Sequence, residues 1–190
     1  DGAFLTLLQE KLDTITEDTV LVFHMIGSHG PAYFMRYPES YRKFTPDCRT
    51  SEFAKCTDEE IRNAYDNTIA FTDHVLASTV DILNAAQDRV TPAMFFMSDH
   101  GESLGENGLY LHGAPWFMAP LEQIKVPMMV WLSDRFQQSL GISMACLSQR
   151  SAEPLSHDNI FSSILGLADI ATEVRNPALD LTTGCRNTES

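Results

Sequence analysis

The sequence predicts an α/β fold in which helices flank a mostly parallel sheet. Three observations support this prediction: helical periodicity at residues 2–15 and 57–88, short apolar runs at 19–26 and 93–97, and the alternation of these two kinds of segment along the 190 residues. A strand that is apolar on both alternating faces is typical of the interior of a parallel sheet. Alternating strands and helices are typical of layered α/β domains.

The first half of the chain is expected to contain two helices and one interior strand. Leucines and an isoleucine recur at helical spacing in residues 2–15, which indicates an amphipathic helix. The run 19–26 is apolar on both faces and is expected to be an interior parallel strand. Thr57 and Glu60 form a capping box, from which a long helix is expected to extend to about Asp88.

Residues 32–56 show no sustained periodicity and are expected to form a long surface excursion. Loops of this length are usually functional or disordered. Cys48 and Cys56 bracket a short polar segment within it, and a disulfide between them would favour an ordered, functional loop. Closing such a small loop is worth roughly 2–3 kcal/mol.

The second half of the chain is expected to add two strands. The apolar run 93–97 predicts a buried strand, and residues 126–132 predict a third strand with Pro127 at its beginning or at a sheet edge. Ser133 and Asp134 can then cap a short helix.

The C-terminal part is expected to be irregular over residues 141–154 and to end in one more helix. Ser156 or Asp158 is the expected cap of that helix. Its buried side is expected to carry Ile160, Phe161, Ile164, Leu165 and Leu167.

Four cysteines allow three pairings. Cys48 is expected to pair with Cys56, and Cys185 to pin the C-terminal tail to Cys146. Two disulfides would indicate an oxidising compartment. Free thiols, or a metal clip formed by the close pair, remain the alternatives.

The formal net charge of −13 excludes a nucleic-acid partner, because nucleic-acid binding requires a basic face. No stretch approaches about 20 consecutive apolar residues, and the first residues lack the basic region of an export signal. The sequence as given is therefore expected neither to span a membrane nor to carry a signal peptide.

Candidate metal ligands follow the apolar run 93–97. Asp99 and His100 come directly after it, and His112 lies at the far end of a loop rich in glycine. Neighbouring side chains of a strand point to opposite faces, so Asp99 and His100 can converge on one ion only after the chain bends, which Gly101 makes easy. A carboxylate and an imidazole suit zinc, although further ligands must come from elsewhere. The alternative is an ordinary turn or helix entry.

Of the other four histidines, one is a functional candidate and three are expected to be structural or surface residues. His29 follows the run 19–26 in a second turn that contains glycine, so it is a functional candidate. His24 is expected to be a hydrogen-bonded core residue, His74 a structural residue of the long helix, and His157 a surface residue.

Several motifs together resemble one family. They are Gly27-Ser28-His29-Gly30-Pro31, Arg42-Lys43-Phe44-Thr45-Pro46 with the Cys48/Cys56 loop, Tyr65-Asp66-Asn67-Thr68, the block from Ser98 to Gly108, and Tyr110-Leu111-His112-Gly113. They resemble the lipid A phosphoethanolamine transferases, bacterial inner-membrane enzymes whose periplasmic catalytic domain has the alkaline-phosphatase/sulfatase fold. The resemblance covers most of residues 1–170.

The resemblance implies a role for each candidate residue. Asp99 and His100 match two ligands of a catalytic Zn²⁺, and His29 and His112 match a pair beside it that contacts phosphoethanolamine or holds a second zinc. In the family, a threonine nucleophile and a glutamate complete the first zinc site, and both lie upstream of the matched region. Residues 1–190 are therefore expected to be a partial periplasmic catalytic domain without the membrane helices and the nucleophile segment, and to be inactive alone.

The implied reaction moves phosphoethanolamine from phosphatidylethanolamine to a lipid A phosphate through a phosphothreonine-type intermediate, conferring polymyxin resistance. The implied location is the periplasmic face of the bacterial inner membrane, with both lipids and the missing N-terminal part as partners. The tyrosines and phenylalanine of residues 33–41 are expected either to meet lipid or to cover a sheet edge.

Three other hypotheses remain open. One is a periplasmic sulfatase or phosphodiesterase of the same superfamily, which hands the intermediate to water. Another is a non-catalytic binding module stabilised by disulfides, without zinc. The third is an incomplete domain that folds in a rearranged or swapped form as a non-native oligomer, because its sheet would expose an edge.

Overall fold

A computed structural model describes residues 1–187 and divides the chain into two compact units. The first contains Asp1–Asp88 and Phe95–Met129, and the second contains Arg89–Met94 and Val130–Ser190. All the candidate metal and substrate residues lie in the first unit. Among the described residues, no helix combines the length and apolar composition that crossing a bilayer requires.

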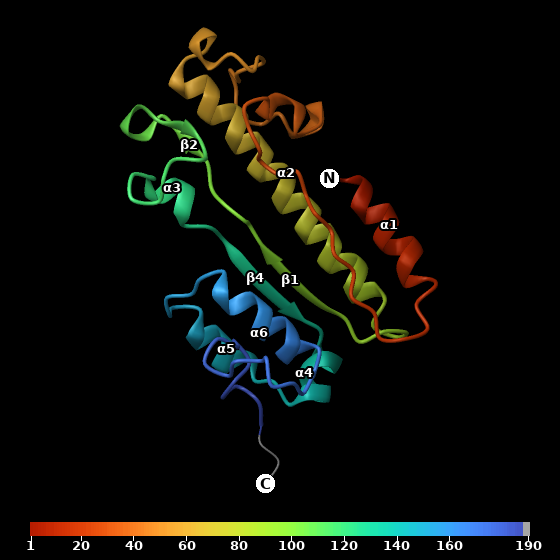
Figure 1. Ribbon diagram of the computed structural model, residues 1–190. Helices are drawn as coiled ribbons and strands as arrows, with labels where there is room; N and C mark the ends of the chain where they lie inside the picture. The colour runs from red at the N-terminus through yellow and green to blue at the C-terminus, as the bar shows by residue number, and fades with distance from the viewer. Residues whose placement is uncertain (188–190) are drawn as a thin grey trace. The chain divides into compact units, whose positions relative to one another are not determined.

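Two helices form the frame of the first unit (Figure 1). The helix α1 spans Ala3–Leu12 and packs against α2, which spans Asp58–Ala85. Leu8 and Leu12 are the buried residues of α1, as its periodicity predicts. The predicted capping box of α2 is confirmed: Thr57 Oγ1 accepts from Glu60 N, and Glu60 accepts from Thr57 N.

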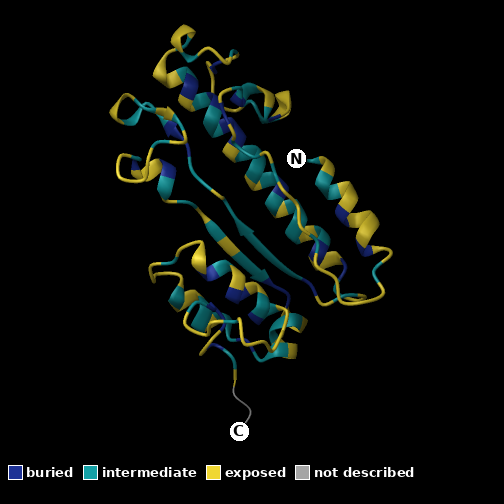
Figure 2. Cartoon of the chain, viewed as in Figure 1, coloured by how far each residue is buried: buried dark blue, intermediate teal, exposed yellow. Residues whose placement is uncertain are grey.

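The predicted strand at 19–26 is wrong. The segment has no regular structure and consists mostly of exposed residues (Figure 2). The exposed fractions of Val20 and Val22 are 72% and 86%. A strand exists only when a neighbouring strand satisfies its backbone groups, and the described residues supply none here. His24, expected in the core, is exposed for the same reason. The end of the run is nevertheless fixed, because the carboxylate of Asp1 accepts from Ile26 N and Gly27 N.

The excursion 32–56 is ordered, as the sequence predicts for a loop tied by a disulfide. Three short 3₁₀ turns occupy Tyr33–Met35, Glu39–Tyr41 and Phe53–Lys55, and Cys48 is bonded to Cys56. A small core joins this loop to α2, in which Tyr33, Cys48, Ile61 and Ala64 are buried. Tyr37 is buried as well, so these two tyrosines are packing residues and do not form a surface for lipid.

The strands β1 (Ala93–Met97) and β4 (Met128–Leu132) appear where the apolar runs predict them and pair with each other. Ser98 N donates to Pro127 O, and Ser133 N donates to Pro92 O. These two bonds show that the strands run in opposite directions. The mixed α/β class is therefore confirmed, but the parallel pairing expected from the run 19–26 does not occur within residues 1–187.

The loop after β1 contains a hairpin. Its strands β2 (Ser103–Leu104) and β3 (Tyr110–Leu111) are antiparallel, with Ser103 opposite Leu111. A 3₁₀ turn at Glu106–Gly108 joins them, and the short helix α3 (Leu121–Ile124) follows the hairpin.

The second unit contains α4 (Asp134–Leu140), α5 (Met144–Arg150) and α6 (Asp158–Leu167). Ser133 caps α4 as predicted. The helix α5 lies in the region expected to be irregular, which is a correction. Although α6 begins at Asp158 with His157 before it, Ser156 supplies the side-chain cap, because its Oγ accepts from Asp158 N at 3.2 Å; of the two expected caps, Ser156 is confirmed and Asp158 is wrong.

The helix α6 also buries the opposite face from the one predicted. Its buried residues are Asn159, Ser162, Ser163 and Gly166, whereas Phe161 and Ile164 are exposed. Polar tail residues explain this orientation: Asn159 donates to Leu179 O, and Leu181 N donates to Ser163 Oγ. Each buried polar group of the helix therefore has a partner in the tail.

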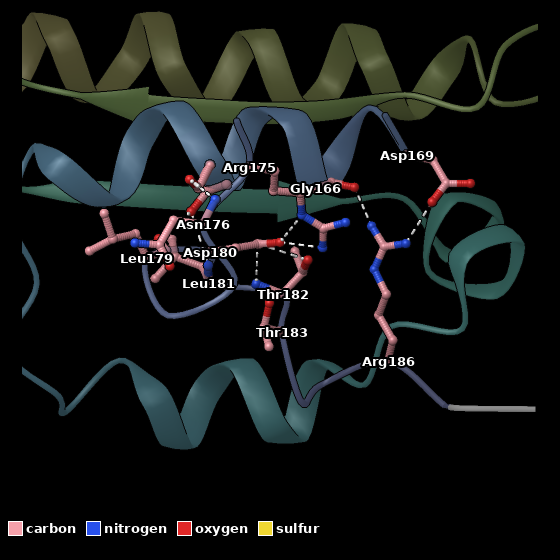
Figure 3. A network of polar contacts seen from close by, with 12 residues as sticks. Gly166, Asp169, Arg175, Asn176, Leu179, Asp180, Leu181, Thr182, Thr183 and Arg186 are labelled. Atoms are coloured by element: carbon pink, nitrogen blue, oxygen red, sulfur yellow. Dashed lines mark hydrogen bonds and ion pairs between the residues drawn. The ribbon is translucent and has the colours of Figure 1, made fainter. Parts of the chain in front are cut away.

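A buried carboxylate, Asp180, organises that tail (Figure 3). It accepts from the guanidinium of Arg175 and from Thr182 N and Oγ1, the last two at 2.8 and 2.9 Å. A Cβ on Gly166 would lie 2.4 Å from Asp180 Oδ2, so only glycine fits there. The predicted disulfide between Cys146 and Cys185 is also present.

Candidate functional site

Three imidazoles gather at one place in the first unit. They belong to His29, His100 and His112, and their ligand nitrogens all lie within 4.8 Å of one another. The ring centroids of His112 lie 4.0 Å from His100 and 4.9 Å from His29. Each histidine comes from a different loop, one after the run 19–26, one after β1 and one after β3. The chain thus brings together the three histidines that the sequence selects.

The Nδ1 atom of every imidazole in this group faces an oxygen acceptor. His29 Nδ1 lies 2.7 Å from Gly30 O, His100 Nδ1 lies 3.0 Å from Gly101 O, and His112 Nδ1 lies 3.0 Å from Glu102 Oε1. These partners require a proton on Nδ1, so each neutral ring keeps its lone pair on Nε2. The bonds at Nδ1 leave Nε2 as the available donor atom of each ring in this group.

This donor set fits a zinc ion. Zinc binds imidazole nitrogen and carboxylate oxygen at about 2.0–2.2 Å, so two ligand atoms of one ion lie at most about 4.2 Å apart. The three nitrogens lie within 4.8 Å of one another, slightly beyond this limit, so the rings would have to move closer together to share one ion. Imidazoles that also bond a carbonyl or a carboxylate through the second nitrogen are typical of protein zinc sites.

Asp99 lies beside the group rather than in it. Its side chain is exposed, and its Oδ1 accepts from His100 N and lies 4.0 Å from His100 Nε2. Asp99 and His100 would have to move somewhat closer together to hold one tetrahedral zinc. The chain has left the strand after Met97, which satisfies the geometric condition for these neighbouring side chains to converge.

Gly101 is needed for close packing. A Cβ at this position would lie 1.9 Å from Glu122 O, and Gly101 N donates to Gln123 O at 3.0 Å. Gln123 is itself buried and donates to Ser103 Oγ. The loop that carries His100 therefore rests directly on the backbone of α3.

Glu102 is the buried acidic residue of the site. Both of its oxygens are occupied: Oε1 accepts from Gly30 N and His112 Nδ1, and Oε2 accepts from the hydroxyl of Tyr33 at 3.0 Å. Burial, together with the negative charge and the hydrogen bond of Glu102, raises the pKa of Tyr33 far above the usual value of a phenol. Tyr33 therefore remains a proton donor to Glu102 at any ordinary pH.

The remaining histidines lie elsewhere, as the sequence suggests for His74, which is on α2 with its ring 4.9 Å from that of Tyr41. Glu102 and Glu106 both lie in the loop after β1, and the structure separates their roles. Glu106 accepts from Leu104 N within its own turn, whereas Glu102 connects three segments. The spacing of Glu102 two residues after His100 was the only local signal.

An exposed apolar segment follows His112. Residues 113–121 contain no charged side chain, although the chain as a whole has a net charge of −13. The exposed fractions of Trp116, Phe117 and Leu121 are 77%, 84% and 70%. The segment is anchored at its start, because Ala114 N donates to Gln123 Oε1.

Comparisons with known proteins agree with this arrangement. A family model described as Sulfatase matches residues 1–170. The chain is 44% identical over 180 residues to phosphoethanolamine transferase EptA of Salmonella typhimurium, covering 94% of this chain and 33% of that protein. It is 40% identical over 157 residues to phosphatidylethanolamine transferase Mcr-1 of Escherichia coli, covering 83% of this chain and 28% of that protein.

Solved structures match as well. The soluble domain of lipooligosaccharide phosphoethanolamine transferase A from Neisseria meningitidis has a TM-score of 0.93 at 44% identity, over 98% of this chain and 56% of that one. The C-terminal periplasmic domain of phosphoethanolamine transferase EptC from Campylobacter jejuni has a TM-score of 0.88 at 38% identity, over 100% and 59%. The chain spans about a third of the length of its most similar curated relatives. It belongs to the sulfatase family.

Proposed function

We propose that this chain is part of a zinc-dependent enzyme that transfers phosphoethanolamine from phosphatidylethanolamine to a lipid A phosphate. The observation that carries the proposal is the convergence of His29, His100 and His112, one ring nitrogen of each lying within 4.8 Å of the others. Curated relatives named phosphoethanolamine transferase EptA and phosphatidylethanolamine transferase Mcr-1 are 44% and 40% identical to the chain. The added ethanolamine would offset negative charge on lipid A and so weaken the binding of cationic polymyxins.

Each site residue has a proposed role. Asp99 and His100 hold the zinc, and the 4.0 Å between Asp99 Oδ1 and His100 Nε2 would shorten somewhat when they share an ion. His29 and His112 bind the phosphate of phosphoethanolamine beside it, or hold a second zinc. A bound zinc supplies Lewis acidity, which activates a hydroxyl nucleophile and polarises a phosphate oxygen.

The imidazole of His112 can also move a proton. Its Nδ1–H is held by Glu102, so Nε2 is the atom that accepts a proton and returns it to a leaving oxygen. The nearby carboxylate stabilises the imidazolium that forms after Nε2 accepts a proton. His29 is oriented in the same way by Gly30 O, and its Nε2 is the equivalent atom.

Lipid-linked substrates at a membrane surface fit the apolar segment after His112. Trp116 and Phe117 are largely exposed, in a stretch without charge. Tryptophan and tyrosine are enriched where a protein meets the interface of a bilayer, and Trp116 is such a residue. The two disulfides favour an oxidising compartment, so the proposed location is the periplasmic face of the inner membrane.

The chain is proposed to act as part of a larger catalytic domain. It covers 56% of the solved Neisseria meningitidis soluble domain. The threonine nucleophile and the glutamate ligand implied by the resemblance would come from another part of the protein, through a covalent phosphoethanolamine-threonine intermediate. Phosphoryl transfer depends on positioning and charge neutralisation, so the chain without the nucleophile is expected to be inactive.

Metal content tests the proposal. Zinc bound per molecule is measured for the wild type and for Asp99→Ala and His100→Ala, with His74→Ala as the control because His74 lies on α2. The two site variants are expected to lose zinc, and the control is expected to keep it. The proposal fails if the wild type binds no zinc or the site variants bind as much as the wild type, and a wild type without zinc would favour a non-catalytic module.

A hydrolase of the same family is the second candidate, because the matching family model is described as Sulfatase. The two reactions differ only in the final acceptor, a lipid A phosphate or water. An assay of the full-length enzyme with phosphatidylethanolamine, with and without lipid A, separates them. Transfer to lipid A supports the proposal, and release of free phosphoethanolamine at the same rate without lipid A supports the hydrolase.

A further inference from the structure

Glu102 connects two of the three histidine loops through a single carboxylate. Its Oε1 accepts from Gly30 N at 3.3 Å and from His112 Nδ1 at 3.0 Å. Gly30 in turn offers its carbonyl to His29 Nδ1 at 2.7 Å. One oxygen atom is therefore bonded directly to one imidazole and, through one residue of backbone, to the other.

The turn that carries His29 is packed tightly against this carboxylate. A Cβ on Gly30 would lie 2.4 Å from the side chain of Leu111 and 2.9 Å from the hydroxyl of Tyr33. The hydroxyl of Tyr33 holds the second oxygen of Glu102. The side chain of Glu102 is 4% exposed, so water does not compete for these bonds.

His100 is held differently. Its Nδ1 faces the carbonyl of Gly101, and that loop rests on α3 through the bond from Gly101 N to Gln123 O. No bond from Glu102 to His100 is among the contacts of the described residues. Loss of the carboxylate would therefore disturb two imidazoles and spare the third.

We propose that Glu102 is a positioning residue, which fixes His112 in the tautomer with Nδ1 protonated and sets the separation of the His29 and His112 imidazoles. The expected effect of Glu102 on metal and phosphate binding rests on the proposed function. The effect of Glu102 on the tautomer of His112 does not depend on that function. Carboxylates that hold the second nitrogen of a ligating histidine orient the ring and raise its basicity. Glu102 would orient the ring of His112 directly and the ring of His29 through Gly30, whose amide it accepts and whose carbonyl faces His29 Nδ1.

The tautomers are measured in the full-length protein that contains these 190 residues, labelled with ¹⁵N in histidine and free of metal. Long-range ¹H–¹⁵N spectra at a pH where imidazole is neutral distinguish a proton on Nδ1 from one on Nε2. In the wild type, His29, His100 and His112 are expected to carry it on Nδ1. In Glu102→Ala, His112 is expected to populate the Nε2-protonated form and the signals of His29 to shift, while His100 is unchanged.

Two further variants separate positioning from stability. Tyr33→Phe removes the bond to Oε2 and leaves His112 its acceptor, so it should lower stability without changing the tautomer of His112. Glu102→Gln keeps an oxygen that can accept from Nδ1 and should restore the wild-type tautomer. Zinc affinity, titrated with Zn²⁺ alone against a chelator, is expected to fall about 10–100-fold in Glu102→Ala, less in Glu102→Gln and not in Tyr33→Phe.

These experiments distinguish a failure of the proposed function from a failure of the positioning role of Glu102. A wild type that binds no Zn²⁺ overturns the proposed function and leaves the tautomer result standing. An unchanged His112 tautomer in Glu102→Ala overturns the positioning role, as does an equal change in Tyr33→Phe. If Glu102→Ala does not fold, Glu102→Met decides, because it keeps most of the side-chain volume and removes the acceptor: a shift of His112 toward the Nε2-protonated form supports the positioning role, and an unchanged tautomer overturns it.

Discussion

Glu102 in the first unit and Asp180 in the second are both buried carboxylates, and their partners differ. Asp180 is bonded to the guanidinium of Arg175 and to two groups of Thr182. Glu102 accepts from a backbone amide, a phenol and an imidazole. The guanidinium of Arg175 neutralises the charge of Asp180. The charge of Glu102 instead lies beside Nδ1 of His112, which leaves Nε2 of that ring available to a ligand.

The difference separates a structural carboxylate from a functional one. Gly166 closes the space around Asp180, because even a Cβ would meet its oxygens. The imidazole bonded to Glu102 belongs instead to a group of three rings that can share an ion. Burial alone does not distinguish the two residues. The identity of the partners does.

The largest expected effect on stability is that of Asp180→Ala. It leaves the guanidinium of Arg175 without its buried partner, which typically costs 3–5 kcal/mol. Denaturant unfolding should show this loss, while zinc binding by the folded protein is unchanged. Asp169→Ala is the matched control, because its ion pair with Arg186 is exposed on the aspartate side and is worth about 0–1 kcal/mol. Equal losses in the two variants would contradict the comparison.

The two disulfides extend the comparison to covalent links. The chain-entropy relation predicts about 4 kcal/mol for the 39-residue separation of Cys146 and Cys185, and about 2.5 kcal/mol for the 8-residue separation of Cys48 and Cys56. Replacing each pair with alanine and measuring the free energy of unfolding checks the order. A larger loss for the shorter loop would show that packing around Cys48 outweighs loop entropy.

A smaller effect is expected at acid pH from Asp47, a buried carboxylate in the same unit as Glu102. Burial raises its pKa, but hydrogen bonds from Arg42 and Tyr37 and the charge of Arg42 outweigh this and lower the pKa below 3.8. A lowered pKa in the folded state adds stability above the unfolded value, which is lost as pH falls through the folded value.

Unfolding free energy measured as a function of pH tests this sign. The wild type should lose stability below about pH 3.8, and Asp47→Asn should be less stable at neutral pH but less sensitive to acid. Asp99→Asn is a suitable control for acid sensitivity, because the side chain of Asp99 is exposed. An identical acid dependence in Asp47→Asn and the wild type would show that other carboxylates dominate.

Features that depend on neighbouring residues were predictable from the sequence. The capping box at Thr57, the cap at Ser133 and the strands β1 and β4 all follow from local patterns and are present. The pairing of Cys48 with Cys56 follows from their short separation. For the site, the predicted grouping of His29 and His112 with His100 is found, because each follows a segment that ends at a turn. Their individual roles stay predictions.

Features that depend on distant partners were not predictable. The apolar run 19–26 has the composition of an interior strand, but a strand needs a neighbour. The helix α5 is short, and tail contacts hold it, including the disulfide of Cys146 and the bonds from Arg150 to tail carbonyls. The role of Glu102 depends on Gly30 and Tyr33, which lie about seventy residues away in the sequence.

The contact between Gly101 and the backbone of α3 has a consequence for how this gene can vary. A carbonyl oxygen stands 1.9 Å from where any side chain would begin. Every missense change at that codon adds at least one carbon there, and the smallest of them, alanine, already collides with main chain that cannot rotate away. Codon 101 can therefore change only to other glycine codons, unless the loop that carries His100 moves.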